Sequence, residues 1–357
     1  MKKPRRPFSL VRIGQKRKLV IGLVSLITTG FALMTCRGED IAALRARANQ
    51  LFGPLPAQMP GAEQETPAMV RLGHRLFIDK RLSADKTVSC DTCHPLLGSG
   101  AYPGPTARGV AGKHGERNSP TVFNAGLQFA QFWDGRATDL VAQAKAPMFN
   151  PNEMNMPAEA ELLRRLRAVR AYQQLFQQAF SQTPDPVSVE NLARALAAFE
   201  RTLITHDRFD DFLKGKSRAL NREEQKGLAT FLETGCAKCH DGPGLGGMSF
   251  QKLGVYHAYA NTNDLGRAKV TRADSDAYKF KVPSLRNVAL TAPYFHDGQV
   301  PTLDSAVRQM AYLQLDLQLS PTDVESITTF LHALSDKELV LRTPTHHRSG
   351  LTDPQPH

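Results

Sequence analysis

The chain has 357 residues, enough for about two domains, and its hydrophobic share of 41% and charged share of 22% are ordinary for a soluble globular protein. Its net charge of +11 is misleading, because residues 1–18 carry eight basic and no acidic side chains, which leaves +3 (11 − 8) for the rest. The body therefore lacks the clear basic face that nucleic-acid binding requires, and we expect no nucleic-acid partner.

An export segment opens the chain. The basic residues 1–18 precede an apolar run of 17 residues at 19–35, the order found in export signals. The run lies at the short edge of the roughly 17–25 residues that span a membrane, and no clear Ala-x-Ala cleavage site follows it. We expect residues 1–36 to be a signal peptide or an uncleaved anchor. The body then lies in the periplasm and meets the membrane only through this segment.

Residues 37–66 resemble a linker that begins with a short helix at 40–49 and is then broken by prolines. The next expected helix covers residues 67–80, where apolar side chains recur on one side. Residues 95–120 are rich in Gly and Pro and predict a long loop, a kind of segment that is usually functional or disordered.

Helical periodicity resumes over about residues 158–180 and 187–204. Asn221 and Glu224 form a capping-box pattern, and Ser320 before Pro321 predicts another helix start. Strand-like alternation is scarce, and the polar tail 341–357 is expected to be disordered. The pattern predicts an all-α fold with long loops.

Two Cys-x-x-Cys-His motifs carry the chemistry. They are Cys90, Cys93 and His94, and Cys236, Cys239 and His240. Such a pair of cysteines can form thioether bonds to haem, and the adjacent histidine then supplies an iron ligand. Of the five cysteines only Cys36 remains, so a disulfide framework is excluded by count. A thioredoxin-like pair or half a zinc site does not require the following histidine. We therefore expect two covalently attached haem c groups.

Each motif follows an amphipathic helix, which predicts two cytochrome c-like domains with one haem each, at residues 67–207 and 208–340. The sixth ligand of each iron would decide the function. A weak methionine ligand raises the potential and suits electron transfer. An open position with acid–base groups nearby suits peroxide chemistry.

Several further stretches resemble the bacterial di-haem cytochrome c peroxidases and their MauG-type relatives, over about residues 65–337. The resemblance depends on Leu72-Gly73 with Leu76-Phe77, Arg81-Leu82-Ser83, Arg117-Asn118-Ser119-Pro120-Thr121, Phe132-Trp133-Asp134-Gly135-Arg136, Val282-Pro283-Ser284-Leu285-Arg286-Asn287 and Pro293-Tyr294-Phe295-His296-Asp297-Gly298. With two haem motifs in the family's order, these matches are highly specific.

The resemblance implies a role for each haem. The domain of His94 would be the low-potential, peroxidatic one, and the domain of His240 the high-potential one where electrons enter. Trp133 would help electrons cross between the haems. Glu153 would be the acid–base group at the peroxidatic haem, and Gln143 would orient peroxide. Taken singly, the three could equally be a core aromatic, a loop acid and a surface helix residue.

Met310 lies at the place where these peroxidases keep the methionine ligand of the second haem, although a methionine on an apolar helix face is usually core packing. The MauG-type enzymes have tyrosine there, so Met310 favours a peroxidase. The family also holds a calcium ion, and its matching positions here are Asn118, Thr291 and Pro293. Carbonyl oxygens and water would supply most of the ligands.

One departure concerns the loop after the first motif. Many family members have a histidine there that caps the resting peroxidatic iron, but its place here falls near Val110. The nearest histidine is His114. It is either that ligand through a shifted loop or a solvated residue, in which case the first iron rests open.

The resemblance therefore implies reduction of hydrogen peroxide to water with electrons from small c-type cytochromes or cupredoxins. The alternatives are a MauG-like oxidase acting on a protein or quinol, and a non-enzymatic di-haem electron carrier. Whether the protein forms a homodimer stays open.

Overall fold

The computed structural model describes residues 40–342, so the predicted export segment 1–36 and nearly all of the predicted tail 341–357 lie outside the described residues. Within the described range, no helix is long and apolar enough to cross a membrane. The α-helices are α1 (Ile41–Leu51), α2 (Pro67–Phe77), α3 (Cys90–Cys93), α4 (Leu140–Phe149), α5 (Glu159–Arg167), α6 (Arg170–Ala179), α7 (Val189–Glu200), α8 (Arg208–Leu213), α9 (Arg222–Glu233), α10 (Ala268–Thr271), α11 (Leu303–Leu315), α12 (Pro321–Ala333) and α13 (Lys337–Arg342).

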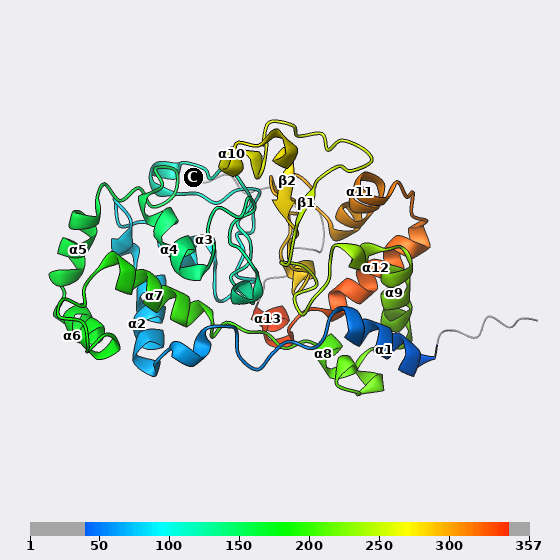
Figure 1. The fold of residues 1–357 in the computed structure, drawn as a ribbon, viewed down its shortest axis with the longest axis horizontal. Coiled ribbons are helices and arrows are strands. Elements are labelled where there is room, and N and C mark those ends of the chain that lie inside the picture. Colours follow the sequence, from blue (N-terminus) through cyan, green and yellow to red (C-terminus); the bar gives the residue numbers. More distant parts are fainter. Residues whose placement is uncertain (1–39, 343–357) are drawn as a thin grey trace, which may run out of the picture. The chain divides into compact units, whose positions relative to one another are not determined.

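Two short strands, β1 (Phe250–Lys252) and β2 (Lys279–Lys281), pair antiparallel with Phe250 opposite Lys281. All other regular structure in residues 40–342 is helical, and long loops join the helices at the centre of the molecule (Figure 1). The expected all-α fold is confirmed.

The buried apolar side chains form two main cores. The first contains residues of α2, α4, α5, α6 and α7, and the second contains residues of α1, α8, α9, α11 and α12. Leu44, Ala48 and Phe52 belong to the second core, so the start of the predicted linker 37–66 is packed structure. The boundary expected between residues 207 and 208 stays a prediction.

Local sequence signals start the helices as expected. The Thr66 hydroxyl accepts a hydrogen bond from Met69 N at 3.2 Å and begins α2. Asn221 and Glu224 form the predicted capping box of α9, in which Asn221 Oδ1 accepts from Glu224 N at 2.9 Å and Glu224 Oε2 accepts from Asn221 N at 2.8 Å. These signals act within one turn, which is why they can be recognised in the sequence.

Each core is built on one helix crossing, α2 with α7 and α9 with α12. Glycine permits both crossings. A Cβ added to Gly73 would lie 1.9 Å from Ala195 O, and one added to Gly227 would lie 2.0 Å from Ser326 O. Neither backbone can move aside within a packed core, so a residue with a Cβ would clash at both positions. The two halves therefore share the same close approach of two helices.

The single helix expected over residues 158–180 is two helices, α5 and α6, separated at Ala168 and Val169. Leu162 and Leu166 are buried on α5, and Tyr172 and Phe176 are buried on α6. The step from 166 to 172 does not fit the helical repeat of 3.6, so a break is needed for both stretches to face one core.

The segment between α7 and α8 is locked by side chains from both halves. Thr205 N donates to Asn124 Oδ1 at 3.0 Å, and the Thr205 hydroxyl accepts from Asn124 Nδ2 at 2.7 Å and from Asn287 Nδ2 at 3.3 Å. Beside it the fully buried Arg286 donates to Asp207 at 2.6 Å. These contacts fix the two cores to each other and thereby position the site between them.

Candidate functional site

The first haem-attachment motif forms the short helix α3 and the residue after it. His94 is half-buried, and its Nδ1 lies 3.1 Å from Gly100 O. This contact orients the imidazole and leaves Nε2 for a metal. Burial lowers the pKa of His94, which favours the neutral, ligating form.

The second motif repeats this arrangement. His240 Nδ1 lies 3.1 Å from Leu245 O, and burial again lowers the histidine pKa. In both motifs the ring is therefore aimed by a backbone carbonyl a few residues downstream. Within residues 40–342 no three His, Cys, Asp or Glu side chains gather as a metal cluster, which fits isolated histidine ligands better than a zinc site.

A cavity of about 410 Å³ lies over the first motif. Its lining includes Cys90, Cys93, His94, Trp133, Gln143 and Glu153. The structure thus brings the three predicted side chains to the first motif from distant parts of the chain. A flat cofactor tethered by two cysteines and ligated by one histidine fits this donor set.

Glu153 reaches the cavity from the loop that follows α4. Gln143 lies on α4 itself. Asn150 Nδ2 donates to Glu153 Oε1 at 2.8 Å, and Val110 N donates to Glu153 O at 2.8 Å. Burial raises the pKa of Glu153, against the opposing effects of Arg136 and Asn150. Burial, and after it the charge of Glu153, raises the pKa of Cys93 to about 11, which places the carboxylate near the motif.

A second cavity, of about 230 Å³, lies over the second motif. Cys236, Cys239 and His240 line it together with Met310, which lies on α11 and packs against the second core. The soft thioether therefore lies at the same cavity as the histidine, as a sixth ligand requires.

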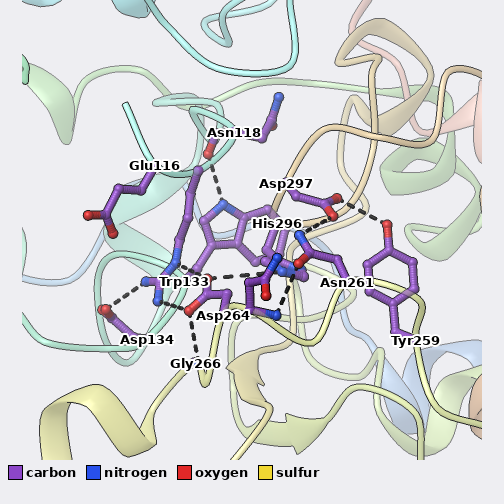
Figure 2. A network of polar contacts seen from close by, with 12 residues as sticks. Glu116, Asn118, Trp133, Asp134, Tyr259, Asn261, Asp264, Gly266, His296 and Asp297 are labelled. Atoms are coloured by element: carbon purple, nitrogen blue, oxygen red, sulfur yellow. Dashed lines mark hydrogen bonds and ion pairs between the residues drawn. The ribbon is translucent and has the colours of Figure 1, made fainter. Parts of the chain in front are cut away.

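Trp133 lines both cavities. Its Nε1 donates to Asn118 O at 2.9 Å, and Asn118 N donates to His296 O at 2.8 Å (Figure 2). The rings of Trp133 and His296 meet edge to face, with centroids 6.5 Å apart. The tryptophan is therefore held in a fixed orientation in the wall that the two cavities share.

The turns that carry Trp133 and His296 have the same structure. An isolated antiparallel bridge closes each turn, Gln131 with Ala137 and Tyr294 with Val300. The residue before each ring has a positive φ, 65° at Phe132 and 70° at Phe295. Trp133 and His296 thus occupy equivalent positions in two related halves.

An ion network beside Trp133 was not anticipated from the sequence. Arg117 donates to Asp134 at 2.6 Å and to Asp264 at 2.6 Å, across 147 positions of chain in the second case. Hydrogen bonding and charge from Arg117 overcome burial and lower the pKa of Asp264. Arg117 belongs to a stretch that resembles the family, whereas Asp264 lies in a loop whose pattern gives no signal.

His114 does not reach the site. It is exposed in the loop after the first motif, does not line the first cavity, and has its Nδ1 3.2 Å from Thr106 Oγ1. Val110 is buried in the first core instead. The described conformation therefore gives no support to His114 as the ligand of the first iron.

The three residues expected at calcium all line the second cavity: Asn118, Thr291 and Pro293. Asn118 Nδ2 donates to Gly104 O and Pro105 O, both at 3.2 Å. These two bonds fix the amide plane and direct Oδ1 away from the two carbonyls. These residues offer oxygen donors of the kind that a hard cation takes.

Comparison with known proteins gives consistent results. Residues 67–218 match the family described as di-haem cytochrome c peroxidase. Cytochrome c551 peroxidase of Pseudomonas aeruginosa is 43% identical, over 88% of this chain and 92% of that protein. Cytochrome c551 peroxidase of Nitrosomonas europaea is 38% identical, over 95% of this chain and 99% of that protein.

Two proteins of the MauG type also match. Methylamine utilization protein MauG of Methylorubrum extorquens is 34% identical, over 88% of this chain and 93% of that protein. A crystal structure of a MauG-like protein associated with microbial copper homeostasis superposes with a TM-score of 0.72 at 28% identity. It covers 80% of this chain and 95% of the other.

Proposed function

This chain belongs to the di-haem cytochrome c peroxidase family, and we propose that it reduces hydrogen peroxide to water at the cavity of His94 with electrons that enter at the cavity of His240. The observation that carries the proposal is the shared wall. The cavity that holds Glu153 and Gln143 and the cavity that holds Met310 meet at one tryptophan, Trp133.

The two haem c groups supply the redox chemistry when they are bound. Reduction of one peroxide takes two electrons and two protons and yields two waters, so the chain must move protons at the first cavity. Glu153 suits this task because burial raises its pKa, and a positioned carboxyl group can take a proton and return it. It accepts the proton from one peroxide oxygen and returns it to the oxygen that leaves as water.

Gln143 and Trp133 have positioning roles. Gln143 lines the first cavity on the side of α4 and offers both an N–H donor and a carbonyl acceptor to peroxide. Trp133 is held by Asn118 O, and its indole gives electrons an aromatic path between the cavities. Among the described residues that line the second cavity with Met310 there is no Asp or Glu, which suits an electron port.

Electrons come from small c-type cytochromes or cupredoxins in the periplasm, where an export segment over residues 1–36 delivers the chain. Met310 favours this role over that of a MauG-like oxidase, in which tyrosine occupies the equivalent place. A calcium ion at Asn118, Thr291 and Pro293 would stabilise the loops between the cavities. His114 lies at the surface, and His94 is the one described histidine that lines the first cavity, so a haem bound there would have no histidine cap from this conformation.

Peroxidase activity of Glu153→Gln tests the proposal. With a reduced small cytochrome as donor, we expect kcat to fall by about 10²–10⁴-fold, the usual contribution of a positioned acid–base group. Glu116→Gln is the matched control, because Glu116 lines the same cavity but lies at the surface, 3.8 Å from Lys269. Full activity in Glu153→Gln would contradict the mechanism. Absence of peroxide turnover in the parent protein would favour the electron carrier.

A further inference from the structure

The lysine and arginine side chains that line the two cavities are almost all neutralised by carboxylates of the chain. The neutralised cations are Arg117 with Asp134 and Asp264, Arg136 with Asp134, Lys269 with Asp264, and Arg286 with Asp207 and Asp210. Lys281 is the exception: it has no carboxylate within ion-pair distance in residues 40–342.

Lys281 lies at the end of β2 and is only 4% exposed. Its Nζ donates to Gln128 Oε1, an uncharged acceptor. Burial lowers the pKa of Lys281 to about 7, and the more distant charge of Asp134 opposes this only in part. A buried ammonium without a paired anion is costly, so such a group normally has a charged partner.

The position of Lys281 points to that partner. It lines both cavities, and its backbone N donates to Trp133 O at 2.7 Å, so it lies in the shared wall. Beside Trp133, in the lining of the second cavity, Nδ1 and Nε2 of the buried His296 have no hydrogen-bond partner among the described residues. Among the described residues Lys281 thus lacks a paired anion, and His296 lacks a hydrogen-bond partner.

We infer that Lys281 is the counter-cation of a haem propionate carboxylate at the wall between the two cavities, and that its charge sets the reduction potential of the haem it contacts. This inference depends on the haem c groups of the proposed function. Every haem carries two propionates, and no other Lys or Arg side chain lining both cavities is described. A positive charge beside a haem favours the added electron and thus raises the potential.

Potentiometric titration of the purified holoprotein tests the inference, with both haems followed by their absorption bands. We expect Lys281→Met to lower the midpoint potential of one or both haems. Lys281→Arg keeps the positive charge and should therefore have potentials close to those of the parent. Resonance Raman spectra provide a second measurement, because the propionate bending band of the affected haem should move in Lys281→Met alone. Lys279→Met is the matched control: Lys279 lies on the same strand, lines neither cavity and pairs with Asp276 at 3.0 Å.

A shift confined to one haem supports the inference and identifies the propionate partner. Unchanged potentials and an unchanged propionate band in Lys281→Met would overturn it, as would equal shifts in Lys279→Met. Both measurements read equilibrium properties of the bound haems. A failure of peroxide turnover would therefore refute the proposed function and leave this test readable.

Discussion

Glu200 is a buried acid whose replacement should change how stability depends on pH. It ends α7, is 5% exposed and lines the first cavity with Cys90. The neighbouring Arg201 is bonded to Glu65 and to Pro60 O instead. Burial, only partly opposed by Arg201, raises the pKa of Glu200 from 4.5 to about 8. A haem in the cavity would displace water and act in the same direction.

The direction in which stability changes with pH follows from the proton that Glu200 binds. Between pH 4.5 and 8 the unfolded chain has lost the Glu200 proton while the native protein keeps it, so stability falls as pH rises. The loss amounts to about 1 kcal/mol at pH 5 and about 3 kcal/mol at pH 7. Glu200→Gln keeps the shape and removes the ionisation. The free energy of unfolding of the variant, measured relative to the parent, should therefore increase by about 2–3 kcal/mol from pH 5 to pH 7.

Guanidinium titrations followed by circular dichroism at several pH values would measure this difference. Glu190→Gln is the control, because Glu190 lies on the same helix with a largely exposed carboxylate paired with Lys145. The free energy of unfolding of this control should change with pH in the same way as that of the parent. If Glu200→Gln also ran parallel to the parent between pH 5 and 7, Glu200 would be ionised in the native protein and the reasoning would be wrong.

Three further changes give separate expectations. Trp133→Phe should slow electron transfer between the haems by about tenfold or more in stopped-flow single turnovers, with unchanged midpoint potentials, whereas equal rates would exclude the indole path. Met310→His should lower the potential of the second haem by more than about 60 mV, since imidazole stabilises oxidised iron better than a thioether, and titration measures it. Arg286→Met leaves the buried Asp207 and Asp210 without their cation and should cost about 3–5 kcal/mol in denaturant unfolding; a change below 1 kcal/mol would contradict this.

The sequence predicted best what a few neighbouring residues decide. The caps of α2 and α9 were recognised because donor and acceptor lie within one turn. The orientation of the histidine in each Cys-x-x-Cys-His motif is likewise decided locally, since its carbonyl partner lies five or six residues downstream. The break between α5 and α6 was missed because no proline or glycine marks it, and only the requirement of a common core reveals it.

Groups whose importance depends on burial could not be identified in advance. Glu200 and Lys281 are ordinary charged residues in the sequence, and their significance appears only when distant segments enclose them. The same holds for Asp264, which meets Arg117 across 147 positions. The placement of Glu153 and Gln143 at the first cavity was expected only through the family resemblance, because no local pattern links either residue to His94.

The relation between the two halves explains why similar frameworks can hold unequal sites. Met310 is the eighth residue of α11, and the eighth residue of α4, the helix after the equivalent turn, is Pro147, which also lines its cavity. Proline carries no donor atom for iron in its side chain. Under the proposed function, the position that would supply a thioether ligand in the second half therefore supplies none in the first.

Glu200 likewise has a different residue, Leu331, at the matching position of the second half. Glu200 lies five residues after Ala195, the residue that Gly73 meets, and Leu331 lies five residues after Ser326, the residue that Gly227 meets. Each lines the cavity of its own half. The second half thus presents an apolar side chain and a methionine where the first presents an acid and a proline. Under the proposed function, this difference would suit the second cavity to holding an electron and the first to moving protons.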